Sequence, residues 1–244
     1  WPLNTMMFTV SGTLRFLQAG ELRLAFSKNL TNRPGKDEDS DWDDESRPKL
    51  KTIFGTTEAV FAGYMLDSGI RYWVIDKQVN KDFAWGIAPG AALLYQAFSW
   101  DGSNLVQVDL TTGERVTQAG PVIAYKFNLL MPLLDIAGKV TYKRISLQAS
   151  FAYSPWLIAK DKDFHLLRNR FTKTKAYGKG CKVGWEGRFT LSRYWFLHLS
   201  GSWLWFSARN MDQNWSNVFS QTWSIEHEIT GRQLNIRGGV GMQF

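Results

Sequence analysis

Apolar and polar residues alternate with a period of two along most of this chain, which is the pattern of β-strands. Between residues 60 and 75, apolar side chains occupy one face, and Asp67 and Arg71 fall on the other. Residues 177–191 repeat the pattern, again with charged side chains on the second face. In a soluble sandwich such charges would be buried without partners, whereas in a narrow barrel they can pair across a polar lumen. The alternation therefore predicts an all-β fold, an antiparallel transmembrane β-barrel.

The breaks between the predicted strands are alternately short and long, as in outer-membrane barrels, which have short periplasmic turns and longer extracellular loops. The long polar breaks lie near 31–51, 101–117, 160–170 and 210–217. Nine strands are predicted, at about 2–14, 20–30, 52–76, 82–100, 118–142, 145–159, 171–191, 195–209 and 218–244. Because single-chain bacterial barrels have even strand numbers, we expect about ten strands in the full protein, with the first one preceding Trp1. Slips in the alternation near Pro132 and Gly231 predict β-bulges.

The last eight residues alternate in the same way and end on Phe244. This ending resembles the terminal signal of bacterial outer-membrane proteins; an edge strand of a soluble sheet is the alternative explanation. Counting back from Phe244, whose strand would end in the periplasm, places every long break on the extracellular side. We therefore expect a bacterial outer-membrane location.

Composition agrees with this interpretation. The 244 residues suit one all-β domain over 1–244, and no run reaches the 18 or more apolar residues of a spanning helix. Aromatic residues make up 15% of the chain, including 12 Trp, as aromatic girdles require. The net charge of +7 suits anionic lipid, and because the basic residues are dispersed we expect no nucleic-acid partner. The single Cys181 excludes an internal disulfide and a cysteine-based metal site.

Two of the predicted extracellular loops carry residues capable of catalysis. Asp39 and Asp41 are two apart, so both carboxylates project to one side of an extended segment, where one acquires a raised pKa or the pair binds a cation or water. Asp163 and His165 share this spacing, and a carboxylate that orients an imidazole makes it a competent general base. A solvated acidic surface and a calcium site are alternatives for the first loop, although the Gly and Glu of an EF-hand are absent. The other two histidines are expected to be structural.

Several motifs together resemble the omptin family, the outer-membrane endopeptidases of Gram-negative bacteria. The similarity covers nearly the whole chain and is carried by Asp39-Ser40-Asp41-Trp42, Asp44-Glu45-Ser46-Arg47, Tyr125-Lys126-Phe127, Met131-Pro132, Trp156 and Asp161-Lys162-Asp163-Phe164-His165. Omptins are ten-stranded barrels whose active site pairs two aspartates on one loop with an Asp-x-His on another, across the barrel mouth. By position, the resemblance implies Asp39, Asp41, Asp163 and His165 as the catalytic residues, and an activated water as the nucleophile.

The resemblance also implies substrates and partners. Asp161 matches an acidic residue of the pocket for the basic side chain before the cleaved bond, which implies peptide or protein substrates cleaved after Arg or Lys. No metal and no cofactor are implied, although lipopolysaccharide is a candidate activator. Two departures limit the transfer: Pro48-Lys49-Leu50 replaces a family acid, and Ala97-Phe98 stands where a basic residue of the lipopolysaccharide site would be.

We expect a monomer with its active site on the extracellular side. A non-catalytic adhesin or envelope-assembly subunit is the alternative, whereas a porin is disfavoured because about ten strands enclose a lumen filled by side chains.

Overall fold

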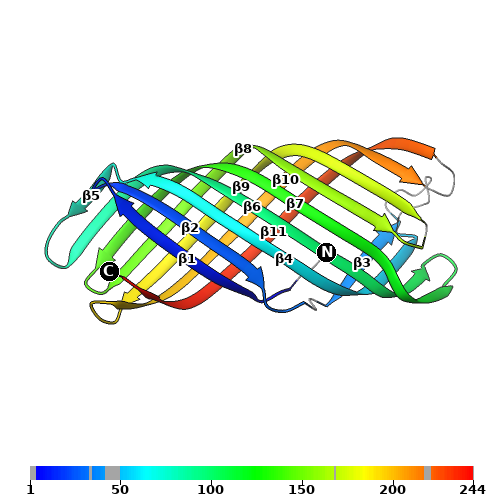
Figure 1. Cartoon of the computed structure of the whole chain (residues 1–244), viewed down its shortest axis with the longest axis horizontal. Helices are drawn as coiled ribbons and strands as arrows, with labels where there is room; N and C mark the ends of the chain where they lie inside the picture. Colours follow the sequence, from blue (N-terminus) through cyan, green and yellow to red (C-terminus); the bar gives the residue numbers. More distant parts are fainter. Residues whose placement is uncertain (1–3, 33–34, 42–49, 168, 217–220, 244) are drawn as a thin grey trace.

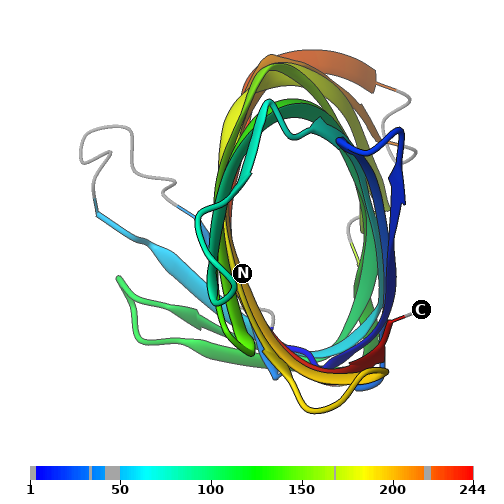
Figure 2. The same cartoon turned by 90° about the vertical axis from the view of Figure 1, so that its left-hand side faces the viewer.

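The structure, a computed structural model, describes residues 4–32, 35–41, 50–167, 169–216 and 221–243, and leaves the side chains of 37, 39–41, 211–216 and 221–227 undescribed. It is an antiparallel β-barrel, and Figure 2 shows its strands as an oval ring. The strands are β1 (Met7–Phe16), β2 (Gly20–Asn29), β3 (Lys36–Asp41), β4 (Ile53–Tyr72), β5 (Ile75–Gln78), β6 (Phe83–Asp109), β7 (Arg115–Tyr142), β8 (Ile145–His165), β9 (Arg170–Thr190), β10 (Trp195–Ser216) and β11 (Gln221–Met242). No helix long and apolar enough to cross a membrane occurs among the described residues.

The sheet has nine positions, in the order β1-β2-β4-β6-β7-β8-β9-β10-β11. The two short strands add no positions, because each continues a longer one. β3 pairs with β4 beyond the segment that pairs with β2, and β5 pairs with β6 beyond the segment that pairs with β4. The prediction of nine strands is therefore confirmed for the described part of the chain.

All strands run between two ends of the barrel, which Figure 1 shows at the right and left of its long axis. At the loop end, on the right, β3, β6, β8 and β10 end and β4, β7, β9 and β11 begin. At the opposite turn end, β1, β5, β7 and β9 end and β2, β6, β8 and β10 begin. The strands at the loop end are longer than predicted, since β6 continues to Asp109 and β7 begins at Arg115. The predicted loop 101–117 is therefore mostly a hairpin. The prediction failed because it ended strands where apolar residues stop, although backbone pairing continues beyond them.

The outer surface of the barrel is apolar, as a membrane-spanning sheet requires. Large hydrophobic side chains alternate outward along every long strand; examples are Leu24 on β2, Ile136 on β7, Leu147 on β8, Trp185 on β9 and Leu199 on β10. Their neighbours in sequence point into the barrel. This confirms the predicted alternation and assigns the apolar face to the lipid.

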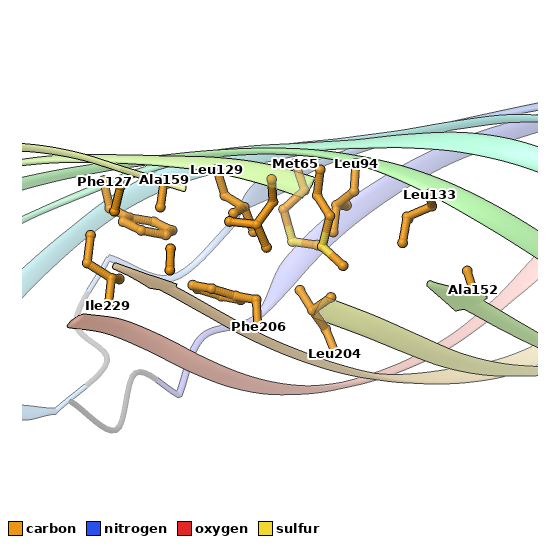
Figure 3. Close-up of a cluster of buried hydrophobic side chains, with 14 of the residues drawn as sticks. Met65, Leu94, Phe127, Leu129, Leu133, Ala152, Ala159, Leu204, Phe206 and Ile229 are labelled. Carbon is orange, nitrogen blue, oxygen red and sulfur yellow. The ribbon is translucent and has the colours of Figure 1, made fainter. Parts of the chain in front are cut away.

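The interior is divided into layers, which the inward residues of β7 display in order. From the loop end these are Tyr125, then Phe127, Leu129, Met131 and Leu133, and then Asp135 and Lys139. The middle group belongs to a buried hydrophobic cluster that spans the lumen. Figure 3 shows Phe206 and Leu204 of β10 pointing toward Leu129 and Met65 from the opposite wall. Phe127 and Phe206 are stacked with their centroids 5.9 Å apart, so side chains fill this part of the barrel.

Toward the turn end, charged and polar side chains pair across the lumen. Arg71 of β4 donates two hydrogen bonds to the Asp135 carboxylate of β7, and Lys182 of β9 pairs with Asp67 of β4. In neither pair are the two strands neighbours in the sheet. These pairs confirm that the charges on the second face of the predicted strands meet inside the barrel.

One of the two predicted bulges is correct. The ladder between β7 and β8 shifts between Leu130 and Leu134, on either side of Pro132. The prediction at Gly231 is wrong, because β10 and β11 pair without a shift through Gly231 and Phe206. A Cβ atom at position 231 would lie 2.2 Å from the Phe206 ring. Glycine therefore serves here to make room for an inward aromatic ring.

Candidate active site

A bulge in β8 turns the predicted catalytic residues into the barrel. Ser154 pairs with Gly180 of β9, whereas Leu157 pairs with Gly178, so β8 holds one residue more than its partner. The Ser154 hydroxyl donates a 2.6 Å hydrogen bond to the Trp156 carbonyl across this bulge. An extra residue exchanges the two faces of the strand beyond it.

The exchange is visible in the burial of β8. Before the bulge, odd-numbered residues such as Leu147 and Phe151 are exposed on the outer surface. Beyond it, the odd-numbered Leu157, Ala159 and Asp161 are buried. Asp163 and His165 continue this inward face, and the intervening lysines point outward. The bulge is thus the local reason that the acidic and imidazole side chains face the lumen.

The prediction that Asp161, Asp163 and His165 lie in a loop is wrong, because β8 continues to His165 and remains paired with both neighbours. Asp39 and Asp41 likewise lie in strand β3, opposite Gly55 and Ile53 of β4. The alternation Lys160-Asp161-Lys162-Asp163 is polar on both faces, so apolar periodicity could not identify it as a strand.

Asp163 and His165 form a close pair at the loop end. The His165 Nε2 atom lies 3.0 Å from Asp163 Oδ2, and both side chains are partly exposed. In this arrangement Nε2 carries the proton and donates to the carboxylate, which leaves Nδ1 as the basic nitrogen. The second carboxylate oxygen of Asp163 is buried and has no hydrogen-bond partner among the described residues.

Asp161 is the most buried acid of the group, with 4% of its surface exposed. The Tyr125 hydroxyl of β7 donates a 2.7 Å hydrogen bond to its Oδ2 atom. Its Oδ1 atom is buried and accepts no hydrogen bond from the described part of the chain. Tyr125 in turn stacks on Trp100 of β6, with ring centroids 4.2 Å apart. One oxygen of this carboxylate is therefore held by the protein, and the other is buried without a partner among the described residues.

A cavity of about 970 Å³ lies beneath these residues. Asp161, Asp163 and Tyr125 line it, together with aromatic and apolar side chains of the hydrophobic cluster: Phe61, Met65, Phe98, Trp100, Phe127 and Phe206. Its size is typical of ligand sites. The rest of its wall is largely polar and comes mainly from β1 and β11, with Thr9, Glu228, Arg232 and Gln233 among the lining residues. An unsatisfied buried carboxylate oxygen in such a wall suits a cationic group.

Other predicted residues contribute less to this arrangement. The side chains of Asp39 and Asp41 lie outside the described residues, so their position relative to His165 remains a prediction. The side chain of His227 also lies outside the described residues, so its expected structural role remains a prediction. His198 lies inside the barrel with its Nε2 atom 3.7 Å from Glu186. No group of three or more His, Cys, Asp or Glu side chains that could hold a metal ion was found in the described ranges.

The sequence interpretation missed the roles of Tyr125 and Trp100. Tyr125 was noted only as part of a family motif. Its inward position follows from the alternation Tyr125, Phe127, Leu129 along β7, and its pairing opposite Asp163 places it beside Asp161 on the same wall. The register between β7 and β8, which the bulge determines, is the information that the sequence lacked.

Comparison with known proteins supports the resemblance. The profile of the omptin family matches residues 1–244. The structure is similar to the crystal structure of the outer membrane protease OmpT from Escherichia coli, with a TM-score of 0.83 and 15% sequence identity over 98% of this chain and 84% of that chain. A search of curated protein sequences gave no significant match.

Proposed function

Because the chain belongs to the omptin family, we propose that this outer-membrane barrel is an endopeptidase in which His165 and Asp163 activate a water molecule for peptide-bond hydrolysis. The observation that carries the proposal is the 3.0 Å contact between His165 Nε2 and Asp163 Oδ2, at the edge of a cavity that Asp161 and Asp163 line. We propose further that cleavage occurs at basic residues and that the loop end faces the cell exterior.

The proposed reaction uses the two nitrogens of His165 differently. Nδ1 accepts a proton from water as the water oxygen attacks the scissile carbonyl carbon, and Asp163 stabilises the resulting imidazolium. The same proton is then given to the leaving amine when the tetrahedral intermediate collapses, which regenerates the neutral imidazole. By family resemblance, Asp39 and Asp41 would position the water or donate to the intermediate. Asp161 would bind the basic side chain of the substrate.

The test is cleavage of a fluorogenic peptide containing basic residues by the detergent-solubilised protein. His165→Ala should lower kcat/KM by about 10²-fold or more, as expected for loss of a general base. Asp163→Asn removes one charge-assisted hydrogen bond of about 1.5–3 kcal/mol, equivalent to roughly 10- to 150-fold. His198→Ala is the matched control and should retain wild-type activity. His198 also lies inside the barrel beside a carboxylate, with its Nε2 atom 3.7 Å from Glu186 Oε1, but it belongs to the part of β10 at the turn end.

Equal rates for wild type and His165→Ala would refute the proposal. Activity is expected to persist in EDTA and in the presence of serine and cysteine protease reagents. A requirement for an added divalent ion would favour the calcium interpretation of the acidic segment. Binding of peptides without cleavage would favour the adhesin alternative.

A further inference from the structure

We propose that Arg170 stabilises the oxyanion that forms on the scissile carbonyl group during peptide hydrolysis. This inference rests on the proposed function, since it adds a catalytic residue to the same site. Its basis is the pairing of β8 with β9, in which Arg170 stands directly opposite His165 at the end of the ladder. Residues directly opposite each other in an antiparallel pair have Cβ atoms about 4.5–5.5 Å apart.

Arg170 and His165 share the inner face of the barrel wall. Their neighbours Phe171 and Phe164 pair on the outer face, where the two ring centroids lie 4.5 Å apart. Because side chains alternate between the two faces along a strand, Arg170 and His165 both point inward. Thr172, the next inward residue of β9, lines the cavity, and the Nε atom of Arg170 is buried. The base of the guanidinium group is therefore enclosed at the site.

The turn between β8 and β9 is fixed to the neighbouring strand. The Leu166 N–H group donates a 2.9 Å hydrogen bond to the Val122 carbonyl of β7, and the Asn169 N–H group donates one of 3.3 Å to the Leu166 carbonyl. Backbone pairing thus sets the positions of His165 and Arg170 before a substrate binds. Donors that are placed in advance in this way cost no reorganisation at the moment of reaction.

The proposed reaction requires a positive charge at this place. Attack of water forms a C–O bond while the electron pair of the carbonyl double bond moves onto its oxygen, and this anion forms beside Asp161 and Asp163. Ionised carboxylates only accept hydrogen bonds, and the Tyr125 hydroxyl and the His165 Nε2 atom already donate to them. Among the described residues that face the lumen between the hydrophobic cluster and the loop end, Arg170 alone carries a permanent positive charge.

The guanidinium group suits this role because it remains protonated while it donates hydrogen bonds. Arg170 gives no proton to the oxyanion. When the C–N bond breaks, the electron pair on the oxyanion returns to form the carbonyl group, and the leaving amine takes its proton from His165. The oxyanion does not exist in the bound substrate, so loss of Arg170 should lower kcat and kcat/KM equally and leave KM nearly unchanged.

The experiment measures kcat and KM for a fluorogenic peptide containing basic residues. Arg170→Gln should lower kcat by about 10²- to 10³-fold, as expected for the loss of an oxyanion donor, whereas Arg170→Lys keeps the charge and should retain part of the rate. Arg209→Gln is the matched control and should leave both constants unchanged. It also removes an arginine near the loop end, but this side chain is 67% exposed on the outer surface, where it pairs with Glu228 at 2.8 Å.

A second measurement separates catalysis from a structural role. A phosphinate analogue of the peptide carries an anionic oxygen at the position of the oxyanion. Its inhibition constant should therefore rise in Arg170→Gln by the same factor by which kcat/KM falls. A residue that only supported the fold would not produce this match.

An unchanged kcat in Arg170→Gln, or an unchanged inhibition constant of the phosphinate, would overturn the inference, and cleavage by wild type would leave the proposed function intact. No cleavage by wild type would refute the proposed function and this inference with it. If Arg170→Gln does not fold, the arginine reagent 2,3-butanedione is applied to wild type and the modified residues are mapped by mass spectrometry. The phosphinate should protect Arg170, and equal modification with and without it would contradict the inference.

Discussion

Asp135 should contribute more to the stability of the barrel than either of its arginine partners. The Arg71 and Asp135 side chains are 1% and 5% exposed, and Arg71 Nη2 donates a 3.0 Å hydrogen bond to Asp135 Oδ1. Arg23 Nη2 lies 3.9 Å from Asp135 Oδ2. The one carboxylate therefore balances two guanidinium groups. Asp135→Asn leaves Arg71 without its anion and Arg23 with Glu21, whose Oε1 atom lies 3.8 Å from Arg23 Nε, whereas Arg71→Met leaves Asp135 with Arg23.

The expected losses follow from this asymmetry. Breaking a buried pair by removing one partner costs about 3–5 kcal/mol, which we expect for Asp135→Asn. Arg71→Met should cost about 1.5–3 kcal/mol, the loss of a charged hydrogen bond, because the remaining carboxylate is still paired. The double variant should lose less than the sum of the two, since the groups are in contact.

The assay is urea unfolding of the detergent-solubilised protein, followed by tryptophan fluorescence. Asp76→Asn is a suitable control, because Asp76 is 36% exposed where it pairs with Lys139 at 3.2 Å, and such pairs are worth about 0–1 kcal/mol. A free energy of unfolding that falls as much for Arg71→Met as for Asp135→Asn would refute the reasoning, because it would mean that Arg23 does not share the carboxylate.

Two further predictions concern the loop end. Deletion of Trp156 removes the extra residue of β8, so Asp161, Asp163 and His165 should turn outward and peptidase activity should be lost. In the same deletion variant, a cysteine replacing Lys162 should change from reactive to protected against a water-soluble thiol reagent. Unchanged labelling would contradict the role of the bulge. The pKa of Asp109 is lowered from its ordinary value, chiefly because the carboxylate accepts hydrogen bonds from the backbone N–H groups of Thr112 and Thr111. A lowered folded-state pKa stabilises the hairpin above about pH 4 and loses this contribution as the pH falls further. The protection factor of the Thr111 amide should therefore fall below about pH 4 in wild type, whereas Asp109→Asn should show no such pH step.

The sequence was sufficient to predict the barrel, because lipid on one side and a filled lumen on the other impose a period of two over long strands. It was also sufficient to identify Asp163 and His165 as a pair, since residues two apart in an extended segment share a face. It could not predict that this face is the inner one. That depends on one extra residue near Trp156, whose effect appears only in the pairing of Ser154 and Leu157 with β9.

The errors have separate physical causes. Strand ends were assigned where apolar residues stop, but that boundary marks the limit of the lipid contact and not of the backbone ladder. Gly231 was interpreted as a backbone irregularity, whereas the structure uses it as space for the Phe206 ring. The hydrogen bond between Tyr125 and Asp161 joins residues of two strands, and no local pattern contains that register.

The hydrophobic cluster across the lumen has a consequence for the direction of transport. A charged or polar solute that passed along the barrel would have to give up its hydration in a layer of Leu, Met and Phe side chains that provide no hydrogen bonds. If the proposed function is correct, peptides that enter the cavity at the loop end, and both fragments formed from them, would therefore leave by the end through which the substrate came. Hydrolysis at this site would change the composition of one compartment only.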